Sequence, residues 1–340
     1  MDIKNSNKTH LGVQKLLAVS VLVILYVFFS IFGNNFFSFT ALVNILDASY
    51  FIGFMAIGVT FVIITGGIDL SLGTTMMCGA LIGGAAYNLW GWDIVSALLL
   101  TIAVSTIIGA INGILIAYLK LPPFIATLGT MMSGMGFGAI VTKVMTMRFP
   151  TIDSPDGWFK YIFYKTSSGF PIGAVWLAAA FAIASVLLNK TRFGRYTFAI
   201  GSNREAARLS GIKVQRMLTM IYTLSGFFSG LAGIFYASVY TTIIPSTGNG
   251  LELLAIAGVV IGGTSMTGGV GSLSGTMIGV FVMSTLKQGL MSMGLQAHWQ
   301  TFITGIVVIG AVLLDNYRIA KAEKISMRGK AVFHGTFPMK

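Results

Sequence analysis

The chain has 340 residues, of which 55% are hydrophobic and only 9% are charged, and its formal net charge is +12. Soluble domains carry about 25% charged residues, so this composition excludes a soluble globular protein and indicates an integral membrane protein. The single cysteine, Cys78, excludes an intrachain disulfide and a thiolate metal cluster. The positive charge does not indicate a nucleic-acid-binding protein, because the basic residues are clustered rather than spread over one face.

A helix that crosses a membrane needs about 20 predominantly apolar residues. The first apolar run, residues 16–33, is followed by no small-residue cleavage site, which predicts a retained helix rather than a cleaved signal peptide. We expect an all-α polytopic membrane protein with about ten transmembrane helices. Their predicted ranges are 15–33, 49–66, 72–90, 94–118, 124–144, 171–188, 217–240, 252–264, 270–290 and 299–315.

Most of the basic residues lie at four places in the chain. The N-terminus, Lys120, residues 190–216 and the part beyond Asn316 together hold 17 of the 22 lysines and arginines. The positive-inside rule assigns all four places to the cytoplasm. The segment count agrees, because the fourth, sixth and tenth predicted helices each return the chain to one of these places. We therefore expect both termini in the cytoplasm.

The same count places residues 145–170 on the extracytoplasmic side. This segment contains Pro150 and Pro155 and is rich in aromatic residues. Two interpretations stay open. The aromatic residues either anchor the segment among the lipid headgroups or contact an extracytoplasmic partner.

Glycine accounts for 42 residues, and many stand four apart, as in Gly109/Gly113 and Gly226/Gly230. Such spacing gives a helix a flat strip that another backbone can approach closely. Two glycine-rich segments, residues 56–74 and 255–276, also look alike and occupy matching places in the two halves of the chain. Paired segments of this kind indicate broken helices along a transport path, and chance similarity is the alternative.

Polar residues in and near the spans are candidates for a substrate pathway or gate. Asp69 follows two glycines and precedes Ser71, so it either caps the next helix or faces a substrate. Amides within spans commonly bond to a neighbouring helix. The four candidates are Asn44, Asp69, Ser71 and Asn112.

Residues 189–216 carry seven basic residues and one acid between two apolar runs. Ser202 and Glu205 are three apart, as in a capping box, and Gly211 fits a left-handed C-terminal cap. The pattern predicts a short capped helix on the cytoplasmic surface, suited to docking another protein.

Motifs for catalysis are absent from the sequence. There is no Gly-x-x-x-x-Gly-Lys-Ser/Thr phosphate-binding loop and no His-Glu-x-x-His zinc motif. We therefore expect no enzymatic activity and no cofactor in this chain, so that any energy for transport comes from elsewhere.

Several motifs resemble those of the ribose-type permeases of bacterial ABC importers, and the similarity extends over about residues 15 to 320. The motifs are Gly66-Gly67-Ile68-Asp69-Leu70-Ser71-Leu72-Gly73, the loop from Lys120 to Gly129, Arg192-Phe193-Gly194-Arg195, residues 199–212 and residues 260–272.

This resemblance implies a cobalamin-importer-like (type II) permease architecture of ten helices. It implies three kinds of partner: cytoplasmic ATPase subunits that bind ATP and Mg²⁺, a second permease that is identical or a paralogue, and an extracytoplasmic sugar-binding protein. Membrane lipid is a further expected partner, because the chain is an integral membrane protein with a basic tail. The domains are then a cytoplasmic N-terminal tail (1–14), a transmembrane permease domain (15–320) with a cytoplasmic coupling loop (189–216), and a basic cytoplasmic C-terminal tail (321–340). The resemblance assigns ATPase coupling to Ser202, Asn203, Arg204, Glu205, Ala206, Ala207, Arg208 and Gly211.

We therefore expect a permease subunit in the bacterial cytoplasmic (inner) membrane that imports ribose or another monosaccharide, driven by the separate ATPase. A permease for a nucleoside or a branched-chain amino acid is an alternative with the same general layout. A secondary transporter is another alternative, but it needs an ion-coupling site, and carboxylates deep in the spans are scarce.

Overall fold

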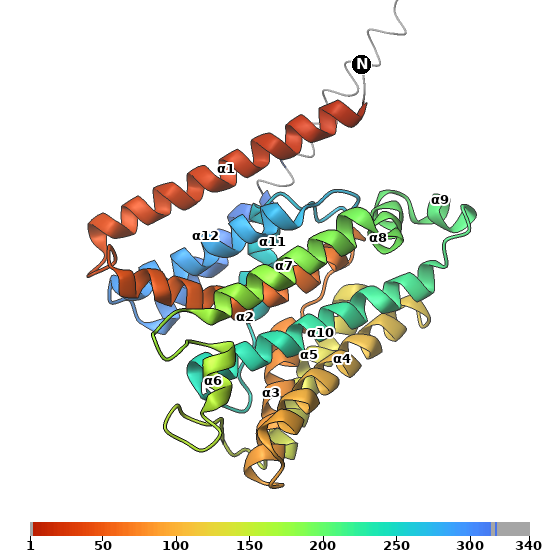
Figure 1. Cartoon of the computed structure of the whole chain (residues 1–340). Helices are drawn as coiled ribbons and strands as arrows, with labels where there is room; N and C mark the ends of the chain where they lie inside the picture. Colours follow the sequence, from red (N-terminus) through yellow and green to blue (C-terminus); the bar gives the residue numbers. More distant parts are fainter. Residues whose placement is uncertain (1–2, 314–316, 318–340) are drawn as a thin grey trace, which may run out of the picture.

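The computed structural model describes residues 3–313 and residue 317 (Figure 1). The described part is mostly helical. Its helices are α1 (Ile3–Phe32), α2 (Phe39–Ile64), α3 (Leu72–Asn88), α4 (Ile94–Ala117), α5 (Pro123–Val141), α6 (Trp158–Phe163), α7 (Ile172–Lys190), α8 (Arg192–Ser202), α9 (Arg204–Leu209), α10 (Val214–Tyr240), α11 (Leu251–Ile261), α12 (Leu273–Ser292) and a last helix, Ala297–Leu313. The two short strands, β1 (Met147–Arg148) and β2 (Thr242–Ile243), pair in antiparallel orientation.

A helix occupies each of the ten ranges that the sequence predicts to cross the membrane. Six helices in the described part are long and apolar enough to cross it alone, namely α1, α2, α4, α5, α7 and α10. The protein is therefore a helical multi-pass membrane protein, and the count of ten crossings stays a prediction. The predicted C-terminal tail, 321–340, lies outside the described residues.

α2 is the centre of the fold, and every residue from Asp47 to Ile64 is buried. A helix that is apolar on all sides must be covered by other helices or by lipid. α10, α12, α11 and α7 pack around α2 and provide this cover (Figure 1).

Helices approach one another most closely where glycines face each other. α4 crosses α10 at Gly109 and Gly226, where a Cβ built on either residue would lie 2.8 Å from the Cα of the other. α12 crosses α11 at Gly279, where a Cβ would lie 1.8 Å from the carbonyl oxygen of Gly258. The predicted glycine strips on α4 and α10 are thus confirmed as contact surfaces that leave no room for a side chain.

The two glycine-rich segments interrupt helices, as predicted. The first separates α2 from α3 at residues 65–71, and the second separates α11 from α12 at residues 262–272. α11 has 11 residues. This is a length of about 16 Å, roughly half of a hydrocarbon core of about 30 Å. α11 is therefore a half-helix that ends inside the fold.

Residues 145–170 fold against the ends of α3, α7 and α10. Phe159 is fully buried, and the buried Lys160 donates from Nζ to Thr241 Oγ1. Trp158, by contrast, is exposed. Part of this aromatic segment is therefore packed into protein, which neither of the two sequence interpretations considered.

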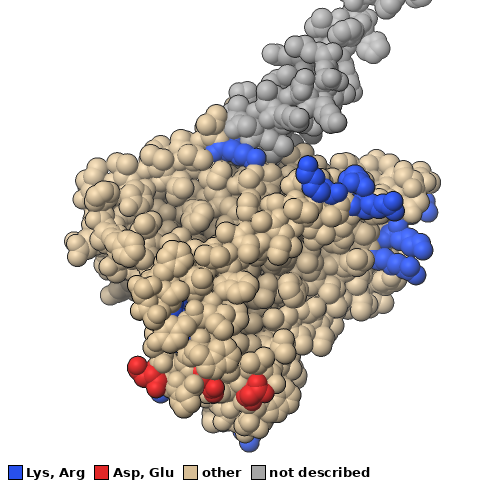
Figure 2. Space-filling view, viewed as in Figure 1, with Lys and Arg blue, Asp and Glu red and all other residues tan. Residues whose placement is uncertain are grey.

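Figure 2 shows that the two signs of charge are separated on the surface. Most of the visible lysines and arginines gather at the end of the molecule where α8 and α9 lie, and the visible acids lie at the opposite end, near α6. This separation agrees with the clusters of basic residues in the sequence and is the asymmetry on which the positive-inside rule depends.

Candidate functional site

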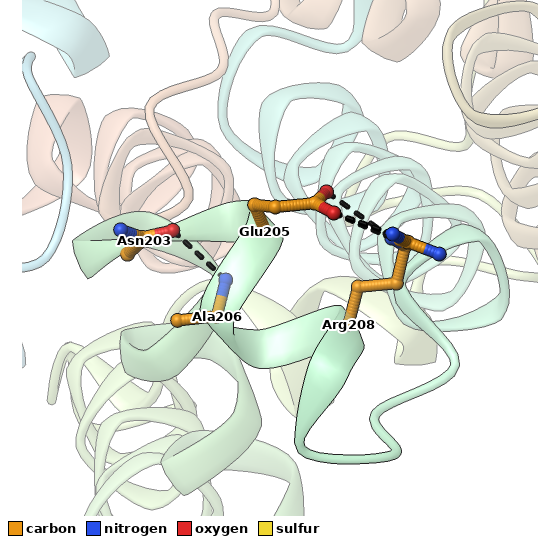
Figure 3. Close-up of polar contacts among 4 residues, drawn as sticks. All are labelled: Asn203, Glu205, Ala206 and Arg208. Carbon is orange, nitrogen blue, oxygen red and sulfur yellow. Dashed lines mark hydrogen bonds and ion pairs between the residues drawn. The ribbon is translucent and has the colours of Figure 1, made fainter.

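The predicted coupling helix is α9, and its N-terminal cap is Asn203. Asn203 Oδ1 accepts a hydrogen bond from the Ala206 amide at 2.9 Å (Figure 3). The predicted capping box of Ser202 and Glu205 is wrong. Ser202 is the last residue of α8, and the extended backbone of Asn203 starts a new helix one residue later. Asparagine is among the strongest N-capping residues, so it outcompetes the adjacent serine.

This shift of one residue changes the role of Glu205. As the second residue of α9, its carboxylate bonds forward to Arg208, at 2.5 Å from one guanidinium nitrogen and 3.1 Å from Nε (Figure 3). Hydrogen bonds from Arg208 hold the pKa of the Glu205 carboxyl below its usual value. Both side chains are exposed, and such a surface pair contributes little stability but fixes a local charge pattern.

The predicted C-terminal cap at Gly211 is confirmed. Gly211 has a φ of +83°, and its amide donates to Arg208 O at 3.0 Å. The next amide, of Ile212, donates to Ala207 O at 3.1 Å. These two bonds form a Schellman motif, which ends α9 after six residues and turns the chain into α10.

α9 presents most of its surface to solvent. The predicted coupling residues are all exposed except Ala207, which is buried and anchors the helix to the bundle. Beside α9 lies an open cavity of about 1040 Å³, bounded by the end of α4, the connection from α4 to α5, and the start of α10. α9 is thus a short, mostly exposed helix that is capped at both ends and lies next to a hollow.

Just before α9 in the chain, the end of α8 contacts both glycine-rich breaks. The contact is made at four glycines: Gly66, Gly201, Gly268 and Gly269. We name this contact the glycine junction. A Cβ on Gly201 of α8 would lie 1.8 Å from Ile64 O at the end of α2, and the Gly269 amide donates to the same oxygen at 2.8 Å. A Cβ on Gly268 would lie 2.8 Å from the Gly66 amide nitrogen. The junction therefore joins α8 to both glycine-rich breaks through backbone atoms alone.

Asp69, in the first glycine-rich break, belongs to a buried network of hydrogen bonds that begins at Ser225 of α10. Its carboxylate accepts from Ser225 Oγ of α10 at 3.0 Å and from the amide and hydroxyl of Ser71 at 3.0 and 2.6 Å. Ser71 Oγ in turn accepts from Asn112 Nδ2 of α4 at 2.8 Å. Asn112 Oδ1 accepts from Thr130 Oγ1 of α5 at 2.6 Å. This buried polar network ties four elements together.

The structure brings together three of the four predicted pathway residues, namely Asp69, Ser71 and Asn112. The interpretation of Asp69 as a helix cap is wrong in detail, because it bonds Ser71, the residue before α3, and no amide within that helix. Asn44 lies apart from them. It is exposed in the second turn of α2, whereas Asp69 follows the opposite end of that helix.

Sequence reasoning missed Ser225, Tyr222 and Thr130. Tyr222 Oη donates to Ile68 O at 3.1 Å, so α10 holds the backbone next to Asp69 as well as its carboxylate. These are single hydroxyls in apolar helices, and such hydroxyls commonly bond only within their own turn. Nothing in the sequence distinguishes them.

Comparison with known proteins identifies the class of molecule. A model of the family described as branched-chain amino acid transport system, permease component, matches residues 41–312. The ribose import permease of Bacillus subtilis (strain 168) is 41% identical over 90% of this chain and 94% of its own length. The galactose/methyl galactoside import permease of Escherichia coli (strain K12) is 37% identical over 85% and 90%. The fructose import permease of Rhizobium meliloti is 33% identical over 84% and 81%.

A solved structure described as an inward-facing ABC transporter of metal-chelate type has the same general fold. Its TM-score to this chain is 0.52 at 14% sequence identity, and the match covers 89% of this chain and 99% of the other. Fold and family together define a transport permease. The chain belongs to the family of permease components of these transport systems, and it is not itself an enzyme.

The position of the cap gives a direct test. Asn203→Ala removes the acceptor for the Ala206 amide, which costs about 1 kcal/mol and raises local opening of α9 about fivefold. Ser202→Ala is the matched control, because Ser202 caps nothing. Amide hydrogen exchange of residues 204–209 in detergent should quicken in Asn203→Ala alone. Faster exchange in Ser202→Ala instead would show that Ser202, and not Asn203, caps α9.

Proposed function

We propose that this chain is the transmembrane permease subunit of an ABC importer and that it moves a monosaccharide into the cytoplasm. The observation that carries the proposal is the 41% identity to the Bacillus subtilis ribose import permease, because it extends over 94% of that permease. The fructose and galactose permeases match over nearly as much of their length. The names of these relatives have monosaccharides in common, so the proposed cargo is this class of sugar.

The proposed topology has ten crossings, a cobalamin-importer-like (type II) arrangement and both termini in the cytoplasm. The separation of charge in Figure 2 supports this orientation. The half-helix α11 crosses with the help of the irregular segments 244–250 and 262–272 at its two ends. Such backbone is tolerated at membrane depth where protein surrounds it. Under this topology α9 faces the cytoplasm and residues 145–170 face the exterior.

The proposed partners follow from this orientation. ATPase subunits, which bind ATP and Mg²⁺, grip α9 from the cytoplasm. A second permease, identical or a paralogue, completes the pathway, and a sugar-binding protein delivers cargo to the outer face. The exposed residues of the capped α9 support the first of these contacts.

Force applied to α9 has a rigid route into the membrane. α9 follows α8 after a break of one residue, and the last turn of α8 holds Gly201 against Ile64 O in the glycine junction. Because the atoms in contact belong to backbones, no flexible side chain absorbs the movement. We infer that a shift of α9 displaces the end of α2 and the 262–272 break together.

The same shift reaches Asp69 by a second route. α10 begins soon after α9, and its Tyr222 and Ser225 hold Ile68 and Asp69. The hydrogen bonds of Asp69, Ser71 and Asn112 are already made within the protein, which suits a gate better than a sugar-binding surface. We propose that these three residues hold the closed arrangement and exchange partners during transport. Asn44, exposed at the far end of α2, is the proposed candidate for the outer pathway.

A branched-chain amino acid is the second candidate cargo, and the description of the matching family favours it. The two classes differ in chemistry, since an amino acid carries an ammonium and a carboxylate and a sugar carries neither. Uptake therefore separates them. The full chain is purified in mild detergent with the proteins that accompany it, reconstituted, and supplied with ATP and either radiolabelled ribose or leucine. An accompanying ATPase and ATP-dependent ribose uptake support the proposal, and leucine uptake alone contradicts it.

Reversal of charge on α9 tests the coupling assignment. Glu205→Arg places a second guanidinium beside Arg208, so the pair repels where it now attracts. We expect normal membrane insertion with loss of ATPase co-purification. Asp153→Arg, on an exposed acid in the opposite loop, is the control and should retain the ATPase. Uptake by Glu205→Arg at the rate of the unaltered protein would exclude α9 as the coupling element.

The glycine junction is tested separately from ATPase binding. Gly201→Ala forces the end of α8 away from Ile64 O, whereas Gly136→Ala, also in a helix, adds a Cβ that meets no atom within 4 Å. We expect Gly201→Ala to bind the ATPase but to lower uptake about two- to thirtyfold, the range of coupling energies carried by such contacts. Equal uptake by the two variants would contradict the proposed route.

A further inference from the structure

Two adjoining hollows lie at the connection between α4 and α5. The first is a groove of about 610 Å³ between the two helices. Its wall is almost entirely apolar, and of its two hydroxyl residues Thr130 donates inward to Asn112. The apolar residues that line it include Val104, Ile108, Ile111, Leu115, Ile125 and Phe137. The groove is open because Gly129 leaves empty space where another residue would place a side chain.

The length of the groove along α4 matches the thickness of one leaflet of a lipid bilayer. Along α4 it extends from Val104 to Leu115. This distance of eleven residues corresponds to a rise of about 16 Å, or roughly half of a 30 Å hydrocarbon core. Its deep end lies mid-helix, and its other end reaches Leu121 in the connection between α4 and α5.

The second hollow is the cavity beside α9, and its lining is strongly basic. The cations are Lys120, Arg204, Arg208, Lys213 and Arg216. Glu205 is the one acid among the lining residues, and Arg208 already binds it. Within the described part of the chain, the other four cations form no ion pair with a carboxylate. The cavity therefore offers unpaired positive charge at the membrane surface.

Leu121 lines both hollows, so the apolar groove and the basic cavity adjoin at this residue. We propose that together they form a binding site for one anionic phospholipid, with an acyl chain in the groove and the phosphate among Lys120, Lys213 and Arg216. Basic pockets that adjoin spanning helices on the cytoplasmic side attract anionic headgroups. A sugar does not fit the groove, because its hydroxyls would lie against aliphatic side chains without partners.

A lipid bound at this site contacts α9, the proposed coupling helix. Its headgroup end touches α9 and the start of α10, so a bound phosphate holds these elements against the connection from α4 to α5. The assignment to the cytoplasmic leaflet rests on the proposed topology. The binding itself does not, and it is measured on the isolated chain without ATPase or sugar.

The full chain in detergent is titrated with phosphatidylglycerol or with phosphatidylcholine of the same acyl chains, and bound lipid is counted by native mass spectrometry. We expect one tightly bound phosphatidylglycerol and a raised unfolding temperature, neither of which phosphatidylcholine or free glycerol phosphate reproduces. Loss of two surface cations in Lys213→Gln/Arg216→Gln should weaken binding about thirtyfold. Lys190→Gln/Arg195→Gln, which alters exposed cations outside the cavity, should not.

The groove has its own matched pair. Gly129→Leu fills the groove and should abolish binding, whereas Gly136→Leu, on the same helix in open space but outside the groove, should retain it. Equal affinity for the two lipids, or equal loss in the test and control variants, overturns the proposal. It is also overturned if Lys213→Gln/Arg216→Gln keeps its lipid but loses the ATPase, because the cavity then serves a protein partner.

Discussion

Close contact between backbones is the constraint on which this structure depends. In lipid, apolar helices gain little from burying one another, so they associate through contact at short range. Here glycines provide it: Gly109 against Gly226 joins α4 to α10, and Gly279 against Gly258 joins α12 to α11. The buried part of α2, from Asp47 to Ile64, is enclosed by neighbouring helices in the same way. The glycine junction depends on the same close contact, because it joins α8 to both glycine-rich breaks through backbone atoms.

The second requirement is that the buried carboxylate of Asp69 finds hydrogen-bond partners. Asp69 would be costly at this depth if its carboxylate were unpaired, and hydroxyls of Ser71 and Ser225 satisfy it. The hydrogen bonds extend through Asn112 to Thr130, so the network runs from Ser225 on α10 to Thr130 on α5. A network of this kind is fully satisfied in one arrangement of its helices, and any other arrangement must break and remake its bonds together.

The sequence predicts correctly those features that depend on residues close together in the chain, such as the positions of the long helices. Helices occupy the ten predicted ranges because each range is defined by its own apolar residues and by the basic residues near its ends. The cap of α9 was misplaced by one residue, because Ser202 and Asn203 both favour the position and only the end of α8 decides between them. The buried network was beyond reach, since Ser225 is 156 positions from Asp69 and Asn112 is 41 from Ser71. Such distances leave no periodicity to find.

The two glycines that bracket α9 have a consequence for how this family can diverge. Gly201 fixes the entry to the loop through backbone contacts, and Gly211 fixes its exit through the Schellman turn. Both contacts use backbone atoms, so they do not depend on the identities of the five exposed residues of α9, whereas Ala207 is buried. Under the proposed coupling, the exposed residues of α9 can therefore differ between relatives that bind different ATPase subunits, while the backbone contacts at Gly201 and Gly211 stay the same.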